Sequence, residues 1–134
     1  MTHERKTPLI LIIDDDEAFL EIISSCLRAA GIDSEIARGA KEGEEYARTL
    51  NPDLILLDMN MPEINGTELL LDLKKDPATK NIKVAFLTTL TNPWPAISAP
   101  SKKFAQELGA IDYLDKTRDL VNIVTKVQEI LGKK

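Results

Sequence analysis

Apolar residues in this chain follow two alternating patterns. Short runs of consecutive apolar residues, such as LILII at residues 9–13, are typical of parallel strands that are buried on both faces. Such runs predict strands at residues 9–13, 53–57 and 83–87. Two segments with fewer consecutive apolar residues predict further strands at residues 33–38 and 110–116. Apolar residues that recur every three or four positions predict helices at residues 16–30, 40–50, 67–75 and 120–131.

This alternation of strand and helix predicts an α/β domain, built on an open parallel sheet with helices on both faces. At 134 residues the chain is long enough for one hydrophobic core and too short for two. Residues 1–7 are polar and are predicted to form a flexible tail, so that residues 8–132 make up a single folded domain. In such sheets the ligand site lies beyond the carboxyl ends of the strands, which makes the polar residues there candidates for function.

Three acids, a hydroxyl and an ammonium lie at the predicted strand ends. Asp14 and Asp15 follow the first strand, Asp58 the third and Thr88 the fourth, and Lys116 closes the fifth. Three carboxylates in one pocket repel one another unless a cation lies among them, and oxygen ligands open to water indicate Mg²⁺ or Mn²⁺. A hydroxyl and an ammonium at the same edge are donors suited to a phosphoryl group. The strand ends therefore predict a site for a divalent cation and a phosphoryl group.

Composition and charge narrow the classes of function. Hydrophobic residues make up 43% of the chain and charged residues 29%, which is typical of a globular protein. The formal net charge of -5 disfavours binding to nucleic acid or to an anionic membrane. A single cysteine excludes an internal disulfide, and the sequence contains neither a signal-peptide pattern nor an apolar run long enough to span a membrane. We expect a cytoplasmic protein, either a monomer or a weak dimer.

The segment DLILLDMNMPEINGTELL, at residues 53–70, resembles the phospho-acceptor segment of response regulator receiver domains. That pattern has an aspartate at a strand end, Met-Pro three and four residues later, and Gly eight residues later. Here these residues are Asp58, Met61, Pro62 and Gly66.

The other positions typical of the family occur in the expected order along the chain. They are Asp14, Asp15, Thr88, Tyr113 and Lys116. The resemblance extends from about residue 8 to residue 131, and five motifs in the correct order make it specific. It implies a flavodoxin-like, doubly wound (βα)5 fold with a five-stranded parallel sheet.

The resemblance also implies a function in two-component signalling rather than an enzymatic one. Asp58 would accept a phosphoryl group from a histidine kinase or a phosphotransfer protein. Asp15 and Asp58 would bind Mg²⁺ directly, the backbone carbonyl of Asn60 would add a ligand, and Asp14 would contribute to the metal site mainly through a metal-bound water. The product would be a phosphoprotein whose output is binding to a downstream protein.

Further family positions imply how the phosphoryl group would be bound and recognised. Thr88 and Lys116 would contact phosphoryl oxygens, and Tyr113 would turn inward and change the surface that the downstream protein binds. Thr89 stands where the family usually has a smaller residue, so it narrows access to Asp58.

Two further departures concern the loops. Thr117 stands where a proline with a cis bond is usual, which predicts a trans peptide and a displaced lysine loop. The proline-rich segment at residues 92–102 predicts that the fourth helix is short or irregular and begins near Ser101.

Three functions remain open at this point. Because the sequence ends soon after the last predicted helix, the first is a stand-alone receiver that acts by binding a partner. The second is a pseudo-receiver, in which the same fold serves as an interaction module that is never phosphorylated. The third is a haloacid-dehalogenase-like phosphatase that uses Asp14 and Asp16, which have the Asp-x-Asp spacing of that family.

Overall fold

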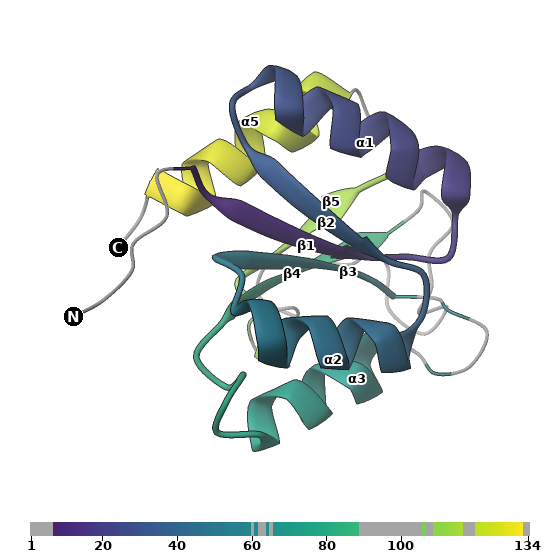
Figure 1. Cartoon of the computed structure of the whole chain (residues 1–134), viewed down its shortest axis with the longest axis vertical. Coiled ribbons are helices and arrows are strands. Elements are labelled where there is room, and N and C mark those ends of the chain that lie inside the picture. Colours follow the sequence, from purple (N-terminus) through teal and green to yellow (C-terminus); the bar gives the residue numbers. More distant parts are fainter. Residues whose placement is uncertain are drawn as a thin grey trace.

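In the part of the chain that the structure describes, five parallel strands form one sheet, in the order β2-β1-β3-β4-β5 (Figure 1). The computed structural model describes residues 7–59, 61, 64, 66–88, 106, 109–116 and 120–132. The strands are β1 (Leu9–Ile13), β2 (Asp33–Ala37), β3 (Leu54–Asp58), β4 (Lys83–Thr88) and β5 (Asp112–Asp115). The helices are α1 (Glu17–Ala29), α2 (Ala40–Leu50), α3 (Gly66–Lys75) and α5 (Leu120–Gly132).

The fold class expected from the sequence is confirmed. Helices α1 and α5 cover one face of the sheet, and α2 and α3 cover the other (Figure 1). Strands β3 and β4 each end on a polar residue, Asp58 and Thr88, one position later than predicted. The predicted fourth helix and the proline-rich segment fall outside the described residues.

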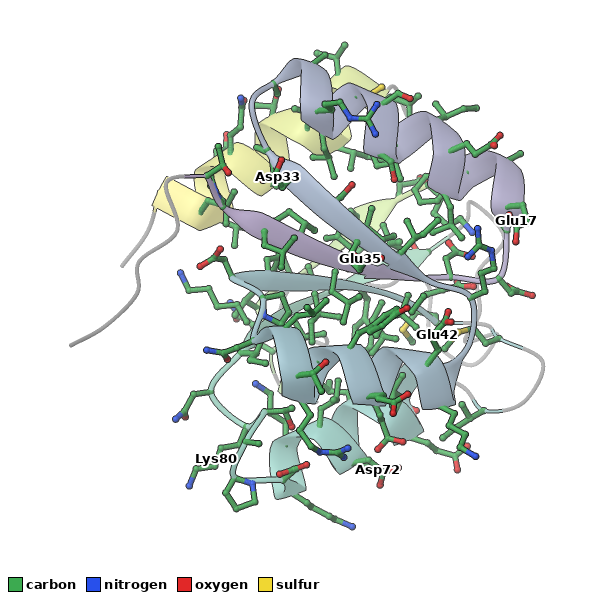
Figure 2. All side chains as sticks on the ribbon, viewed as in Figure 1. Glu17, Asp33, Glu35, Glu42, Asp72 and Lys80 are labelled. Atoms are coloured by element: carbon green, nitrogen blue, oxygen red, sulfur yellow. The ribbon has the colours of Figure 1, made fainter. Side chains whose placement is uncertain are left out.

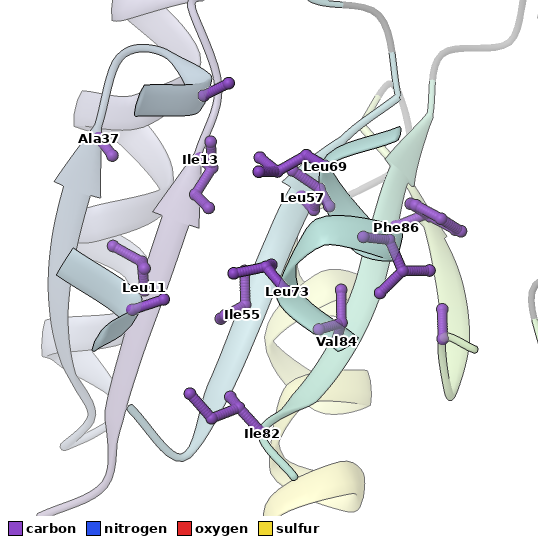
Figure 3. Close-up of a cluster of buried hydrophobic side chains, with 14 of the residues drawn as sticks. Leu11, Ile13, Ala37, Ile55, Leu57, Leu69, Leu73, Ile82, Val84 and Phe86 are labelled. Carbon is purple, nitrogen blue, oxygen red and sulfur yellow. The ribbon is translucent and has the colours of Figure 1, made fainter. Parts of the chain in front are cut away.

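Strand side chains are buried on both faces of the sheet, which explains the uninterrupted apolar runs. In β1, Leu11 and Ile13 pack in the core beneath α2 and α3, whereas Ile10 and Ile12 pack beneath α1 and α5. All four are fully buried. Figure 3 shows the first of these two cores, with residues from β1, β3, β4 and α3. Burying one such side chain contributes about 1.5–3 kcal/mol, so the two cores hold the strands rigidly in register.

Helix α1 has defined signals at both ends. Asp16 is its N-cap, and the Asp16 carboxylate accepts a hydrogen bond from the backbone N–H of Phe19. Glu17 lies in the first turn, where the helix dipole favours negative charge. The helix ends before Gly31, whose φ of 81° lies in the left-handed region that favours glycine. The predicted helix at residues 16–30 therefore begins within one residue of the expected position.

Charged side chains cover the outer surfaces of the helices. Glu17, Glu42 and Asp72 on these helices, and Lys80 in the turn that follows α3, are exposed and point away from the cores (Figure 2). Among the described residues, the helices are all too short or too polar to cross a membrane.

The cap at Asp16 gives a prediction about stability. Asp16→Ala removes the acceptor for the Phe19 N–H and is expected to lower the free energy of unfolding by about 0.5–2 kcal/mol. Asp16→Asn keeps an acceptor oxygen and is expected to retain most of this stability. Urea unfolding of the three proteins measures the difference. Equal losses in both variants would show that the charge of Asp16, and not its cap, stabilises the helix.

Candidate functional site

The candidate site lies at the carboxyl edge of the sheet, where the order of the strands reverses. Strand β1 lies between β2 and β3, and Ile13 is paired with Leu57. Asp14 and Asp58, which follow these two residues, are therefore neighbours at the ends of adjacent strands. This is the position at which open α/β sheets bind ligands.

Three carboxylates meet at this edge. Oxygen atoms of Asp14, Asp15 and Asp58 all lie within 4.8 Å of one another. Asp14 is fully buried and Asp58 is 4% exposed, whereas Asp15 is exposed to solvent. Carboxylate oxygens are the ligands that Mg²⁺ prefers, and the exposed side leaves room for the water molecules that Mg²⁺ usually keeps. The donor set of these three residues therefore fits Mg²⁺.

Asp14 is fixed in place by the backbone around it. Its N–H donates to the carbonyl of Ala37 at 3.0 Å, which ties the end of β1 to the end of β2. Its Oδ1 accepts a hydrogen bond from the N–H of Asp16 at 3.0 Å. Its Oδ2 lies 2.7 Å from the Nζ of Lys116, an ion pair at hydrogen-bond distance. Asp14 is thus held rigidly and its charge is partly balanced.

Lys116 brings a positive charge to the site. Its N–H donates to the carbonyl of Thr88 at 2.6 Å, which holds the residue after β5 against the end of β4. Its ammonium also lies 4.0 Å from Asp16 Oδ2 and 4.9 Å from the centre of the Phe19 ring. Burial lowers the pKa of Lys116, but the contact with Asp14 and the charges of Asp58 and Asp16 more than offset this, so that its pKa is raised. The side chain therefore carries its positive charge throughout the neutral range.

Two further predicted residues lie on β4 and β5. Thr88 is 2% exposed and is paired with Asp115, directly before Lys116. Tyr113 is partly buried and packs against the core beneath α2 and α3. Met61 is 7% exposed and belongs to the same core. The predicted residues Asn60, Pro62 and Thr89, and also Thr117, lie outside the described part of the chain.

Gly66 allows α3 to begin very close to the end of β3. Its N–H donates to the carbonyl of Met59 at 2.8 Å. A Cβ atom at this position would lie 2.6 Å from the carbonyl oxygen of Asp58 and 2.9 Å from the Cα of Met59. Only glycine permits this approach, which explains why a glycine follows Asp58 by eight residues.

Sequence reasoning missed three contributors to this edge. Phe19 was part of an apolar helical pattern, and nothing in that pattern indicated a contact with Lys116. Asp16 was expected in the first turn of a helix, but not within 4.0 Å of the same ammonium. Arg38, which follows β2, forms an exposed ion pair with Glu17 at the start of α1, and no local sequence pattern indicated this pair.

Comparison with known families and proteins agrees with this geometry. The response regulator receiver domain family matches residues 10–128. The chain belongs to the response regulator receiver domain family. Members of this family are generally signalling modules rather than enzymes, and they bind Mg²⁺ at an acidic pocket.

Two relatives show how much of a protein the chain corresponds to. It is 36% identical over 126 residues to the DNA-binding dual master transcriptional regulator RpaA of Synechocystis sp., and this match covers 94% of the chain but 50% of that protein. It is 33% identical over 140 residues to the response regulator Rcp1 of Synechocystis sp., and this match covers 97% of the chain and 91% of that protein. Thus the chain spans half the length of one relative and nearly all of the other.

Solved structures show the same fold. A CheY-like response regulator receiver domain protein from Methanospirillum hungatei JF-1 matches with a TM-score of 0.79 and 28% identity, over 94% of each chain. The chemotaxis protein CheY4 of Vibrio cholerae matches with a TM-score of 0.79 and 25% identity, over 92% of this chain and 98% of that one. The receiver fold is therefore found along almost the whole chain.

The close approach at Gly66 gives a second prediction. Gly66→Ala places a methyl group against the Asp58 backbone, and it is expected to lower the free energy of unfolding by about 1–3 kcal/mol, as overpacking does. Because the displaced atoms belong to Asp58 and Met59, Mg²⁺ binding should weaken as well. Urea unfolding and calorimetric Mg²⁺ titration measure the two effects.

Gly132→Ala is the matched control for this substitution. No atom lies within 4 Å of the Cβ position at Gly132, so the expected change in stability is within about 0.5 kcal/mol. If Gly66→Ala behaves like Gly132→Ala, the approach of α3 to β3 does not constrain the site.

Proposed function

We propose that this receiver domain accepts a phosphoryl group on Asp58 from a phosphohistidine of a histidine kinase or phosphotransfer protein, and then alters a surface that a downstream protein binds. The observation that carries this proposal is the meeting of Asp58 with Asp14 and Asp15 at the carboxyl edge of the sheet, with a lysine ammonium beside them. Membership of the receiver family supports it, because phosphorylation is typical of that family.

Asp58 would act as the nucleophile. A carboxylate oxygen of Asp58 attacks the phosphorus atom, an O–P bond forms, and the N–P bond of the phosphohistidine breaks with its electron pair going to the histidine nitrogen. Asp58 is 4% exposed and lies at the end of a fully buried strand, so its carboxylate is held in one place for this reaction. Such fixed positioning is a large part of catalysis in phosphoryl transfer.

Asp14, Asp15 and Asp58 would hold Mg²⁺ or Mn²⁺ through their side chains, and Asn60 would add its backbone carbonyl. When bound, the cation supplies positive charge that offsets the negative charge of the phosphoryl oxygens. Asp14 is already oriented by the N–H of Asp16, so little conformational freedom is lost when the ligands assemble.

Lys116 and Thr88 would bind the phosphoryl oxygens. The Lys116 ammonium, which contacts Asp14 in this structure, would exchange that partner for a phosphoryl oxygen on Asp58. The Thr88 hydroxyl would donate to another oxygen. The hydrogen bond from the Lys116 N–H to the Thr88 carbonyl couples the two residues, so a movement of one is transmitted to the other.

The altered surface would include β5. Tyr113 is paired with Phe86 on β4, two residues before Thr88, and is only partly buried, so its side chain has room to respond. A movement of Thr88 at the end of β4 would therefore be passed through the paired strand β5 to Tyr113, which is partly exposed to solvent. The downstream protein would recognise the phosphorylated arrangement of this surface.

Phosphorylation itself is tested by intact mass spectrometry. After incubation with Mg²⁺ and acetyl phosphate, the protein is expected to gain one phosphoryl group. Asp58→Asn is expected to gain none, because the nucleophilic carboxylate is lost. Asp72→Asn removes an exposed acid on α3 and should be phosphorylated normally. Mg²⁺ binding by the wild type without any adduct would refute the proposal and favour a pseudo-receiver.

The coupling through Thr88 is tested by NMR. Thr88→Val preserves the shape of a side chain that is 2% exposed but removes its hydroxyl. This variant is expected to accept the phosphoryl group on Asp58 and to lose most of the accompanying chemical-shift change at Tyr113. A full response at Tyr113 in the phosphorylated variant would show that the signal does not pass through the Thr88 hydroxyl.

A further inference from the structure

The ring of Phe19 forms a buried contact with the ammonium of Lys116, which lies against Asp14. The ammonium of Lys116 lies 4.9 Å from the ring centre, within the range of a cation–π interaction. Phe19 is 8% exposed, and the Lys116 side chain is 10% exposed. Because water is largely excluded from this contact, the attraction is stronger than it is between exposed groups.

The position of the ring is fixed by the start of α1. The N–H of Phe19 donates to the N-cap carboxylate of Asp16, and the side chain packs in the core beneath α1 and α5. Asp16 thus contributes twice, since it fixes the backbone of Phe19 and also lies 4.0 Å from the ammonium. A ring held on a helix in this way can define where a flexible lysine side chain rests.

The ammonium therefore rests on the α1 side of the acid cluster. It has Asp14 at 2.7 Å, Asp16 at 4.0 Å and the aromatic face of Phe19 as a further contact. A leucine or isoleucine would satisfy the apolar pattern of the helix equally well, but neither has a face that attracts a cation. Thus the aromatic ring adds a cation–π attraction to Lys116 that packing of the helix alone does not require.

We propose that Phe19 is a positioning residue for Lys116: its ring holds the ammonium beside Asp14, and this hold opposes both the binding of a divalent cation and the transfer of Lys116 to Asp58. The effect on the transfer of Lys116 to Asp58 rests on the proposed function. The effect on divalent-cation binding requires only that the acid cluster binds the metal. Two cations close to the same carboxylate repel each other, so a weaker hold on Lys116 favours the divalent cation.

A series of mono-, di- and trifluorinated phenylalanines at position 19 tests the inference. Each added fluorine withdraws electron density from the ring face and changes the shape of the ring little. Mg²⁺ affinity of the folded domain is measured by calorimetry. The dissociation constant is expected to fall stepwise, by about two- to fivefold in total, as the cation–π attraction is removed.

Two controls isolate the contact with the ammonium. The same series at Phe86, which is fully buried in the core on the other face of the sheet, is expected to show no trend. In a Lys116→Met background the trend at position 19 is also expected to vanish, because the cation is gone. Unfolding midpoints are measured for every protein, so that a general change in stability is recognised.

Each result decides the inference. A stepwise fall in the dissociation constant that requires Lys116 supports it. A flat series at position 19, or the same trend with Lys116→Met, overturns it and assigns Phe19 to packing alone. The titration involves no phosphoryl transfer, so failure of the acetyl phosphate reaction would refute the proposed function and leave this result valid.

Discussion

Mutual repulsion of carboxylates at one edge of the sheet is the constraint on which the site depends. Oxygen atoms of Asp14, Asp15 and Asp58 lie within 4.8 Å of one another, and two of these side chains are almost completely buried. Two unit charges at about this separation repel by about 3–4 kcal/mol at an effective dielectric constant of about 20. Proteins are stable by only about 5–15 kcal/mol, so such an arrangement persists only where the surrounding structure opposes it.

The surrounding structure opposes this repulsion in two ways. The acids follow strands whose side chains are buried on both faces, so they cannot separate without disrupting the two cores. Hydrogen bonds at the same edge, from Asp14 to Ala37, Met59 to Leu87 and Lys116 to Thr88, tie the strand ends together. Lys116 supplies opposite charge, and the N–H of Asp16 supplies a hydrogen bond to Asp14. The rigid sheet therefore holds the three acids close together, and Lys116 and the Asp16 N–H reduce the repulsion that this closeness causes.

Those parts of the structure that depend on local pattern could be predicted from the sequence. The apolar runs and helical periodicity identified the strands and helices, and parallel strands bring their carboxyl ends together, so Asp14, Asp15 and Asp58 were expected to meet. The Phe19 ring could not be placed in this way, because an apolar residue at a helical position predicts burial but not the partner of its ring. Nor could the pair of Arg38 and Glu17 be placed, since their contact depends on how β2 and α1 lie relative to each other.

The choice of lysine as the counter-ion follows from the same constraint. In the proposed function, a cation that balances the acids would also have to leave them when a divalent cation or a phosphoryl group arrives. An arginine could form two parallel hydrogen bonds with one carboxylate, and this would hold it there more firmly. The ammonium of Lys116 is a compact charge on a flexible stem, and it contacts Asp14 through one carboxylate oxygen at 2.7 Å rather than through a two-pronged pair. A single flexible lysine thus lets the chain fold with its three acids close together, and in the proposed function it would also be able to give way to a divalent cation.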